Sequence, residues 1–276
     1  MKKHFDYDEF ENKITEGIKT TPLYRLPELN YTCNVTDKNG EEISASEAFA
    51  QFYYYNYYEE ISSRKILLSN SSLKNEDSFN IKSIHERLDK NGNDKITYSE
   101  QSNRNEENIA KRLFQIGTIN TKNYSRLVVS DYQVPVNRVA NSSEGKVDLV
   151  FTDDSNVIIG ELKDEDSKET LLRAAVEIKT YQYKIQDNPT ARERFWNCYG
   201  PKNVKYQEWI QPAVIMFEDE RSQVWKDFVN VKASTSTFLH HLLLRWDILF
   251  FVVRSDNNKE NKPYKDRNYS LERVML

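Results

Sequence analysis

The sequence predicts a mixed α/β (α+β) fold, and three observations support this prediction. Segments with helical spacing alternate with short apolar runs of strand length through the second part of the chain. The 17 Tyr, 13 Phe and 4 Trp supply large side chains for a core, which disordered chains lack. The length of 276 residues fits one large domain, or a core with an appended subdomain.

A polar, Asn-rich segment divides the chain near residues 90–104. We therefore expect a mainly helical N-terminal region over residues 1–100, with a role in recognition or partner binding. Residues 101–276 are expected to form the core, because the clear alternation of elements begins there.

The most distinct helix predicted in the first region covers residues 44–61. Ser44 and Glu47 fit a capping box, in which each residue bonds the backbone of the other. Four residues recur on one face at near-helical spacing: Ala48, Phe52, Tyr55 and Tyr58. Tyrosines in such a cluster could stack nucleobases, but the pattern favours a packing helix with its hydroxyl groups at the surface.

The second region reads as helix, three strands, helix, strand, helix and strand. Asn105 can cap the first of these helices, Pro135 indicates an edge or a bend in the first strand, and Pro189 follows the end of the second helix. Helices are predicted at 105–117, 167–186 and 222–229, and strands at 126–139, 147–152, 157–163, 212–217 and 248–254.

Two of these strands form a predicted hairpin around the turn sequence at 153–156, which is Asp-Asp-Ser-Asn. A four-residue turn places Thr152 opposite Val157, and counting back along both strands places Asp148 opposite Glu161. Directly opposed side chains have Cβ atoms about 4.5–5.5 Å apart. The register therefore brings two carboxylates side by side on one face of the sheet.

Lys163 lies two residues beyond Glu161 and shares its face. Both faces of the hairpin are otherwise apolar, so these carboxylates are expected to be buried, which costs several kcal/mol unless it is compensated. Mg²⁺ would compensate it, because this ion binds one or two carboxylates together with water and phosphate oxygens. The alternative is an ordinary ion cluster, in which Lys146 and Lys163 pair with Asp148 and Glu161.

The pattern of Asp148, a 12-residue gap and Glu161-Leu162-Lys163 resembles the PD-(D/E)XK nuclease superfamily over roughly residues 105–255. Val147 stands where the superfamily name places a proline. The resemblance implies a restriction-endonuclease-like core, with a central mixed β-sheet flanked by helices. It also implies that this chain is a nuclease that hydrolyses phosphodiester bonds in DNA and uses Mg²⁺, or Mn²⁺ as a substitute. The subfamily is not identified, and a role in restriction or other defence is an expectation from the superfamily alone.

The same resemblance implies roles for individual residues. Asp148, Glu161 and the Leu162 carbonyl would bind the metal, and Lys163 would orient or help deprotonate the attacking water. Superfamily members often carry a further acid on the first helix, and Glu106 lies on its buried stripe; its alternative role is to favour the positive end of that helix. A Gln or Tyr on the helix after the hairpin steadies the site, and Gln182 is the first candidate there, before Tyr181 and Glu177.

A second motif, at residues 89–100, resembles an EF-hand calcium loop. The residues at ligand positions are Asp89, Asn91, Asn93 and Glu100, with apolar Ile96 at position 8. Asp94 stands where a glycine normally makes the sharp turn. The sequence therefore favours an Asn-Gly turn followed by a short strand over a Ca²⁺ site.

The charge and the termini constrain partners and location. A formal net charge of −4 argues against a protein that coats nucleic acid without specificity, but it allows an enzyme with a local basic groove. We expect a nucleic-acid partner, DNA rather than RNA, and a homodimer would supply the two sites that a double-strand cut needs. A non-catalytic nucleic-acid-binding or protein-interaction module on the same fold is the alternative function. The chain shows no secretory signal and no apolar run of membrane-spanning length, so a cytoplasmic protein is expected.

Overall fold

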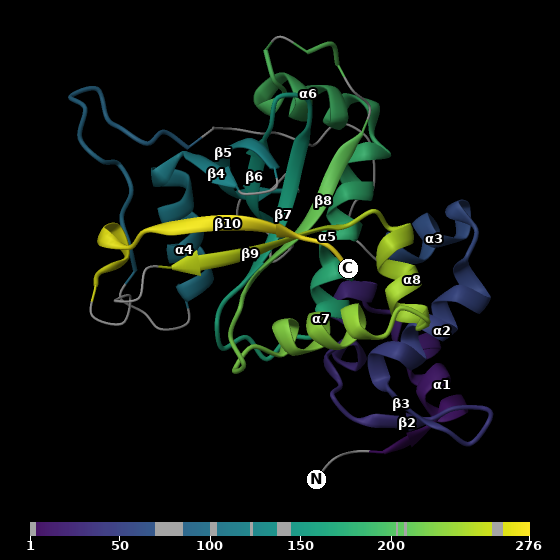
Figure 1. Cartoon of the computed structure of the whole chain (residues 1–276). Coiled ribbons are helices and arrows are strands. Elements are labelled where there is room, and N and C mark those ends of the chain that lie inside the picture. Colours follow the sequence, from purple (N-terminus) through teal and green to yellow (C-terminus); the bar gives the residue numbers. More distant parts are fainter. Residues whose placement is uncertain are drawn as a thin grey trace.

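A computed structural model describes residues 4–69, 85–99, 104–121, 124–136, 145–202, 204–206, 209–255 and 262–276 (Figure 1). The helices are α1 (Tyr7–Gly17), α2 (Ala45–Tyr57), α3 (Glu60–Leu67), α4 (Asn105–Ile116), α5 (Leu171–Gln186), α6 (Pro189–Tyr199), α7 (Gln223–Ala233) and α8 (Phe238–Arg245). The strands are β1 (Phe5–Asp6), β2 (Asn34–Thr36), β3 (Glu42–Ser44), β4 (Thr118–Thr121), β5 (Tyr124–Pro135), β6 (Lys146–Thr152), β7 (Val157–Lys163), β8 (Ile210–Phe217), β9 (Leu249–Ser255) and β10 (Tyr269–Val274).

Within the described residues, the larger sheet has the strand order β10-β9-β8-β7-β6-β5-β4. Strands β7, β8 and β9 are parallel, and the other neighbouring pairs are antiparallel. Parallel neighbours need a crossover, which α5 and α6 supply between β7 and β8, and α7 and α8 supply between β8 and β9. The predicted mixed α/β class is therefore confirmed.

Helices cover both faces of this sheet, as Figure 1 shows for α4 and α5. Alternate residues of the central hairpin point to opposite faces. Val150 and Ile159 belong to the hydrophobic cluster that contains α5. Phe151 and Ile158 belong to the cluster that contains α4. The central strands are thus buried on both sides, as the sequence predicts.

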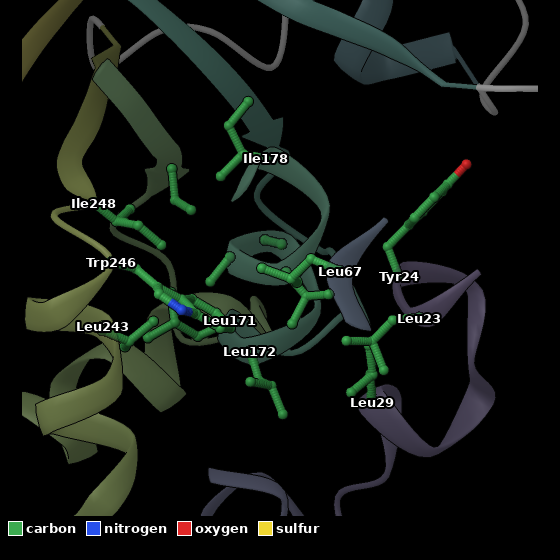
Figure 2. Close-up of a cluster of buried hydrophobic side chains, with 14 of the residues drawn as sticks. Leu23, Tyr24, Leu29, Leu67, Leu171, Leu172, Ile178, Leu243, Trp246 and Ile248 are labelled. Carbon is green, nitrogen blue, oxygen red and sulfur yellow. The ribbon is translucent and has the colours of Figure 1, made fainter. Parts of the chain in front are cut away.

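The described part of the N-terminal region contains a three-stranded sheet, β1-β2-β3, beside α1, α2 and α3, so it is less purely helical than the sequence suggests. Its apolar side chains form one continuous cluster with those of α5 and α8. Figure 2 shows Leu23, Leu29 and Leu67 of this region near Leu171 and Leu172 of α5. The polar segment in the sequence therefore does not separate two independent cores.

The helix predicted at 44–61 is interrupted, because α2 ends at Tyr57 and α3 begins at Glu60. Ser44 caps α2 as predicted, accepting a hydrogen bond from the Glu47 N–H at 3.1 Å. The Glu47 carboxylate instead accepts bonds from the first backbone N–H groups of α8. Tyr55, expected on the packing face, is 70% exposed, and Tyr53 is buried in its place.

Other boundaries differ for local reasons. Helix α5 begins at Leu171 rather than 167, because Thr170 is its capping residue. Asn105 is not a cap; its side-chain oxygen accepts a bond from the Tyr264 hydroxyl. The sequence interpretation missed α6, in which Asn188 caps and Pro189 occupies the first turn, and it missed β10. Among the described residues, no helix combines the length and apolar character needed to cross a membrane.

Candidate functional site

The β6–β7 hairpin has the predicted register from Thr152↔Val157 to Leu149↔Gly160. The strand pairing ends there, before the expected pair of Asp148 and Glu161. Beyond that point the Leu162 N–H donates to Asp148 Oδ2 at 2.9 Å. The Asp148 side chain thus accepts the hydrogen bond that a backbone oxygen of β6 would otherwise accept from Leu162. The carboxylates of Asp148 and Glu161 both lie where β6 and β7 stop pairing.

Asp148 is buried, and each of its carboxylate oxygens accepts a hydrogen bond. Gln133 Nε2 donates to its Oδ1 at 2.6 Å, while Leu162 bonds the other oxygen. Gln133 lies on β5 beyond a register shift between Val129 and Asp131, and its φ of 49° is in the left-handed region. Sequence reasoning missed Gln133 because neither the bulge nor this backbone conformation has a distinct sequence signal.

The pKa of Asp148 is raised to about 6. Burial is the main cause, and the nearby Glu177 adds to it. The Lys163 ammonium and the bonds from Leu162 and Gln133 oppose the shift. The carboxylate is therefore less stable as an anion than an ordinary aspartate, although it keeps three favourable partners.

Lys163 stands at the centre of what we call the acidic cluster: Glu106, Asp148, Glu161, Lys163 and Glu169. Its Nζ lies 2.9 Å from Glu161 Oε1, 2.8 Å from Glu169 Oε2 and 4.0 Å from Glu106 Oε2. Burial alone would lower the pKa of Lys163, but the surrounding carboxylates raise it well above its usual value. Lys163 is therefore a fixed ammonium ion at neutral pH.

Glu161 is a buried carboxylate whose negative charge is disfavoured by its surroundings. Burial, reinforced by the charges of Asp148 and Glu177, raises its pKa well above the usual value, although Lys163 opposes the shift. Its Oε1 meets Lys163, whereas Oε2 is buried without a hydrogen-bond partner among the described residues. A buried anionic oxygen without a partner costs free energy, which a bound cation would recover.

Glu106 joins the cluster from α4, the helix on which the superfamily resemblance places a further acid. Its Oε1 accepts a bond from the Asp164 N–H at 3.4 Å. Burial raises the pKa of Glu106 to about 8, with Lys163 opposing the shift and Asp148 adding to it. Glu106 also lies in the first turn of α4, so its position fits the helix-terminus role as well.

We expect Glu106→Gln to stabilise the metal-free protein at pH 8 but not at pH 4. A carboxyl group whose pKa rises on folding from 4.5 to about 8 contributes stability at low pH, and that contribution is lost as the pH rises through this window. The Glu106 side chain is 35% exposed, so solvent screening limits the gain to about 1 kcal/mol. Urea unfolding at both pH values in EDTA would measure it; an equal gain at pH 4 would contradict the electrostatic explanation.

Helix α5 runs antiparallel to β7 and β8, and this orientation decides which of its residues reach the cluster. Glu169, just before α5, contacts Lys163 at the end of β7. Further along α5, Gln182 Nε2 donates to the backbone oxygen of Ile210, at the start of β8, at 2.6 Å. Gln182 thus lies at the opposite end of the sheet from Lys163, and the structure does not bring this candidate to the site.

The other α5 candidates lie nearer. Tyr181 donates its hydroxyl hydrogen to Glu177 Oε1 at 2.6 Å, and the charge of Glu177 acts on both Asp148 and Glu161. Gly145 accommodates the tyrosine ring, because a Cβ there would lie 1.4 Å from the Tyr181 hydroxyl oxygen. Sequence reasoning also missed Glu169, which precedes the helix proper and shows no helical spacing.

The residues fit a divalent cation only in part. Among the residues that the structure describes, no group of three or more His, Cys, Asp or Glu side chains is arranged to hold a metal ion. Mg²⁺ needs only one or two protein carboxylates, however, because water and phosphate fill the rest of its shell. Asp148 and the unpartnered oxygen of Glu161 meet that smaller requirement. The role of the Leu162 carbonyl stays a prediction.

The predicted calcium loop forms a tight hairpin turn. The Asp89 carboxylate accepts bonds from the backbone N–H groups of Asn91 and Asn93, both at 2.8 Å. Gly92 has a φ of 79°, and Leu88 bridges to Asp94. These contacts fit the Asn-Gly turn that the sequence favours, but the short strand expected after it is absent from the described residues 95–98. Glu100, the last ligand of the calcium interpretation, lies outside the described residues.

Comparisons of the chain with protein-family models, with curated proteins and with solved structures found no match. Function is therefore inferred from the acidic cluster and from the sheet that holds it.

Proposed function

We propose that this protein is a divalent-metal-dependent nuclease with a restriction-endonuclease-like core of the PD-(D/E)XK type. The observation that carries the proposal is that Asp148, Glu161 and Lys163 lie together, buried, where β6 and β7 stop pairing. Glu161 Oε2 has no hydrogen-bond partner within the part of the chain that the structure describes. The order α4, β4, β5, β6, β7, α5 and β8 supports it, since the superfamily places its motif on a hairpin between such elements.

Each residue of the cluster has a proposed task. Asp148, Glu161 and the Leu162 carbonyl would hold Mg²⁺ or Mn²⁺, and the bound ion would polarise the phosphate and lower the pKa of a water molecule. Gln133 orients Asp148 through its 2.6 Å bond. Lys163, as an ammonium, offsets charge on the phosphate and orients the water by donating hydrogen bonds.

Because Lys163 is an ammonium ion, we propose that it orients the attacking water and does not deprotonate it. Because the carboxylates around it raise its pKa well above the usual value, Lys163 has no free lone pair to accept a proton. Glu169 and Glu106 hold the same ammonium from two other sides. We propose that these two acids fix the position of Lys163 between the metal ligands and the substrate phosphate.

Cleavage assays on supercoiled plasmid, linear duplex, single-stranded DNA and RNA test the proposal, each with Mg²⁺, with Mn²⁺ and with EDTA. We expect metal-dependent cutting of DNA that Asp148→Asn abolishes and Asp154→Asn leaves unchanged, because Asp154 lies in the exposed turn of the same hairpin. The products would separate endonuclease from exonuclease action. Failure to cut any of the four substrates with either metal would reject the nuclease and favour the non-catalytic binding module.

A further inference from the structure

A cavity of about 390 Å³ lies between α3, α5 and the end of α8. It is remote from the acidic cluster, since Trp209 in its wall precedes the start of β8, whereas Lys163 ends the parallel strand β7. Ligand pockets for small molecules begin at about 300 Å³. The wall residues that matter here are Glu60, Lys179, Tyr183, Trp209, Arg245 and Trp246.

Lys179 is a buried cation between aromatic rings in this wall. Its Nζ lies 4.7 Å from the ring centre of Tyr183 and 5.3 Å from that of Trp209, and it donates to the Trp246 carbonyl at 3.0 Å. Among the described residues it forms no ion pair with a carboxylate. Burial lowers the pKa of Lys179 to about 7. The charges of Asp247 and Glu60 oppose this shift, but in the described part of the chain no carboxylate pairs directly with the Lys179 ammonium.

The charges around the cavity favour an anion. Arg245 also lines it, with its guanidinium stacked 3.7 Å from the Tyr58 ring centre. The acid in the wall, Glu60, already pairs with Arg64 at 2.5 Å. Among the described wall residues, Lys179 and Arg245 are cations and Glu60 is already paired, while the charge of Asp247 acts on Lys179 from outside the wall.

A second cavity of about 350 Å³ adjoins the first at Arg245. Its walls include Tyr54, Tyr58 and Phe238, and the two tyrosines are partly exposed. Two aromatic compartments that meet at one arginine match the alternation of bases and phosphates along a nucleic-acid strand.

We propose that the Lys179 cavity binds a nucleotide, with the base stacked against Trp209 and Tyr183 and the phosphate held by Lys179 and Arg245. The nucleotide is either free or an unpaired residue of a strand whose next base enters the adjoining cavity. The site is separate from the acidic cluster, so the proposal does not depend on the cleavage activity.

Binding should be linked to pH through Lys179. The charged and titratable groups facing it are Glu60 and Arg64 of α3, Tyr183 of α5, and Arg245 and Asp247 at the end of α8. A bound phosphate favours the charged amine, so binding takes up a proton above pH 7. Affinity should therefore fall as the pH rises from 7 to 8.5, by up to about 10-fold per pH unit.

Calorimetric titration of the full chain in EDTA tests the proposal with four probes: thymidine monophosphate, a thymidine tetranucleotide, thymidine and inorganic phosphate. We expect saturable binding of the monophosphate or the tetranucleotide, and at least about 10-fold weaker binding of thymidine and of phosphate alone. Binding of both thymidine monophosphate and the tetranucleotide would indicate a site for a free nucleotide. Binding of the tetranucleotide alone would indicate a site for a nucleic-acid strand. Equal binding of inorganic phosphate would overturn the proposal.

Substitutions in and outside the wall of the Lys179 cavity test whether the nucleotide binds there. Trp209 is 41% exposed, so Trp209→Ala should fold and lose roughly 10-fold or more in affinity, while Trp209→Phe keeps a stacking ring. Trp225→Ala, on α7 outside the cavity, is the matched control and should bind normally. Lys179→Met should remove the pH dependence. If no probe binds, or if Trp209→Ala binds as the parent does, Lys179 serves only as a cation at the C-terminal end of α8.

Discussion

Glu161→Gln should abolish cleavage while leaving the protein at least as stable as the parent. Glutamine keeps the shape of the side chain and still accepts a bond from Lys163, but it removes a buried negative charge that Asp148 and Glu177 destabilise. Loss of a metal ligand removes several kcal/mol of transition-state stabilisation, so we expect a rate decrease on the order of 10³-fold or more.

Two measurements separate this expectation from general damage. Thermal unfolding in EDTA should show an unchanged or higher Tm for Glu161→Gln, and added Mg²⁺ or Mn²⁺ should raise the Tm of the parent only. Glu272→Gln on β10, which removes a partly exposed ion pair with Arg254 of β9, is the control that keeps both activity and metal response. A Glu161→Gln protein that cuts at the parental rate would remove Glu161 from the site.

Lys163→Met should have the opposite effect on stability and lower the free energy of unfolding by about 3–5 kcal/mol. The ammonium lies within 3 Å of both Glu161 and Glu169, so its removal leaves two poorly solvated carboxylates without their cation. Adding Glu169→Gln to this variant should restore part of the loss, because one of the uncompensated charges disappears.

The pH dependence of the stability loss in Lys163→Met distinguishes uncompensated charge from lost side-chain packing. Without the ammonium, the folded-state pKa values of both carboxyl groups rise, and the stability they contribute at low pH is lost as the pH increases through those values. The difference between variant and parent should therefore shrink when urea unfolding is repeated at pH 4.5. Lys168→Met, an exposed neighbour, is the control. A difference that stays constant with pH would mean that packing, not charge, dominates.

The hairpin that carries the cluster could be predicted because its determinants are local. A polar turn, alternating apolar residues and the position of Lys163 fix the register and the shared face, and the structure shows that register up to Leu149↔Gly160. The place where pairing ends could not be predicted, because it depends on the Asp148 carboxylate replacing a backbone partner for Leu162.

Residues contributed by other elements were harder to predict. Gln182 fits an inward-facing stripe on α5, yet periodicity gives the face of a helix and not its direction over the sheet. The direction places Glu169 at the cluster and Gln182 near Ile210. Gln133 reaches Asp148 from a bulged strand, and irregular backbone of that kind is set by tertiary packing rather than by residue pattern.

The cluster that joins the N-terminal region to α5 has a consequence for how the chain is made. The apolar side chains of Leu23, Leu29 and Leu67 pack in one cluster with α5, which begins about 100 to 150 residues later in the chain. At 5–20 residues per second, roughly 5 to 30 seconds pass before those partners leave the ribosome. The nascent N-terminal region exposes this apolar surface during that interval, so we expect protein yield in cells to depend on chaperone capacity as well as on the final stability.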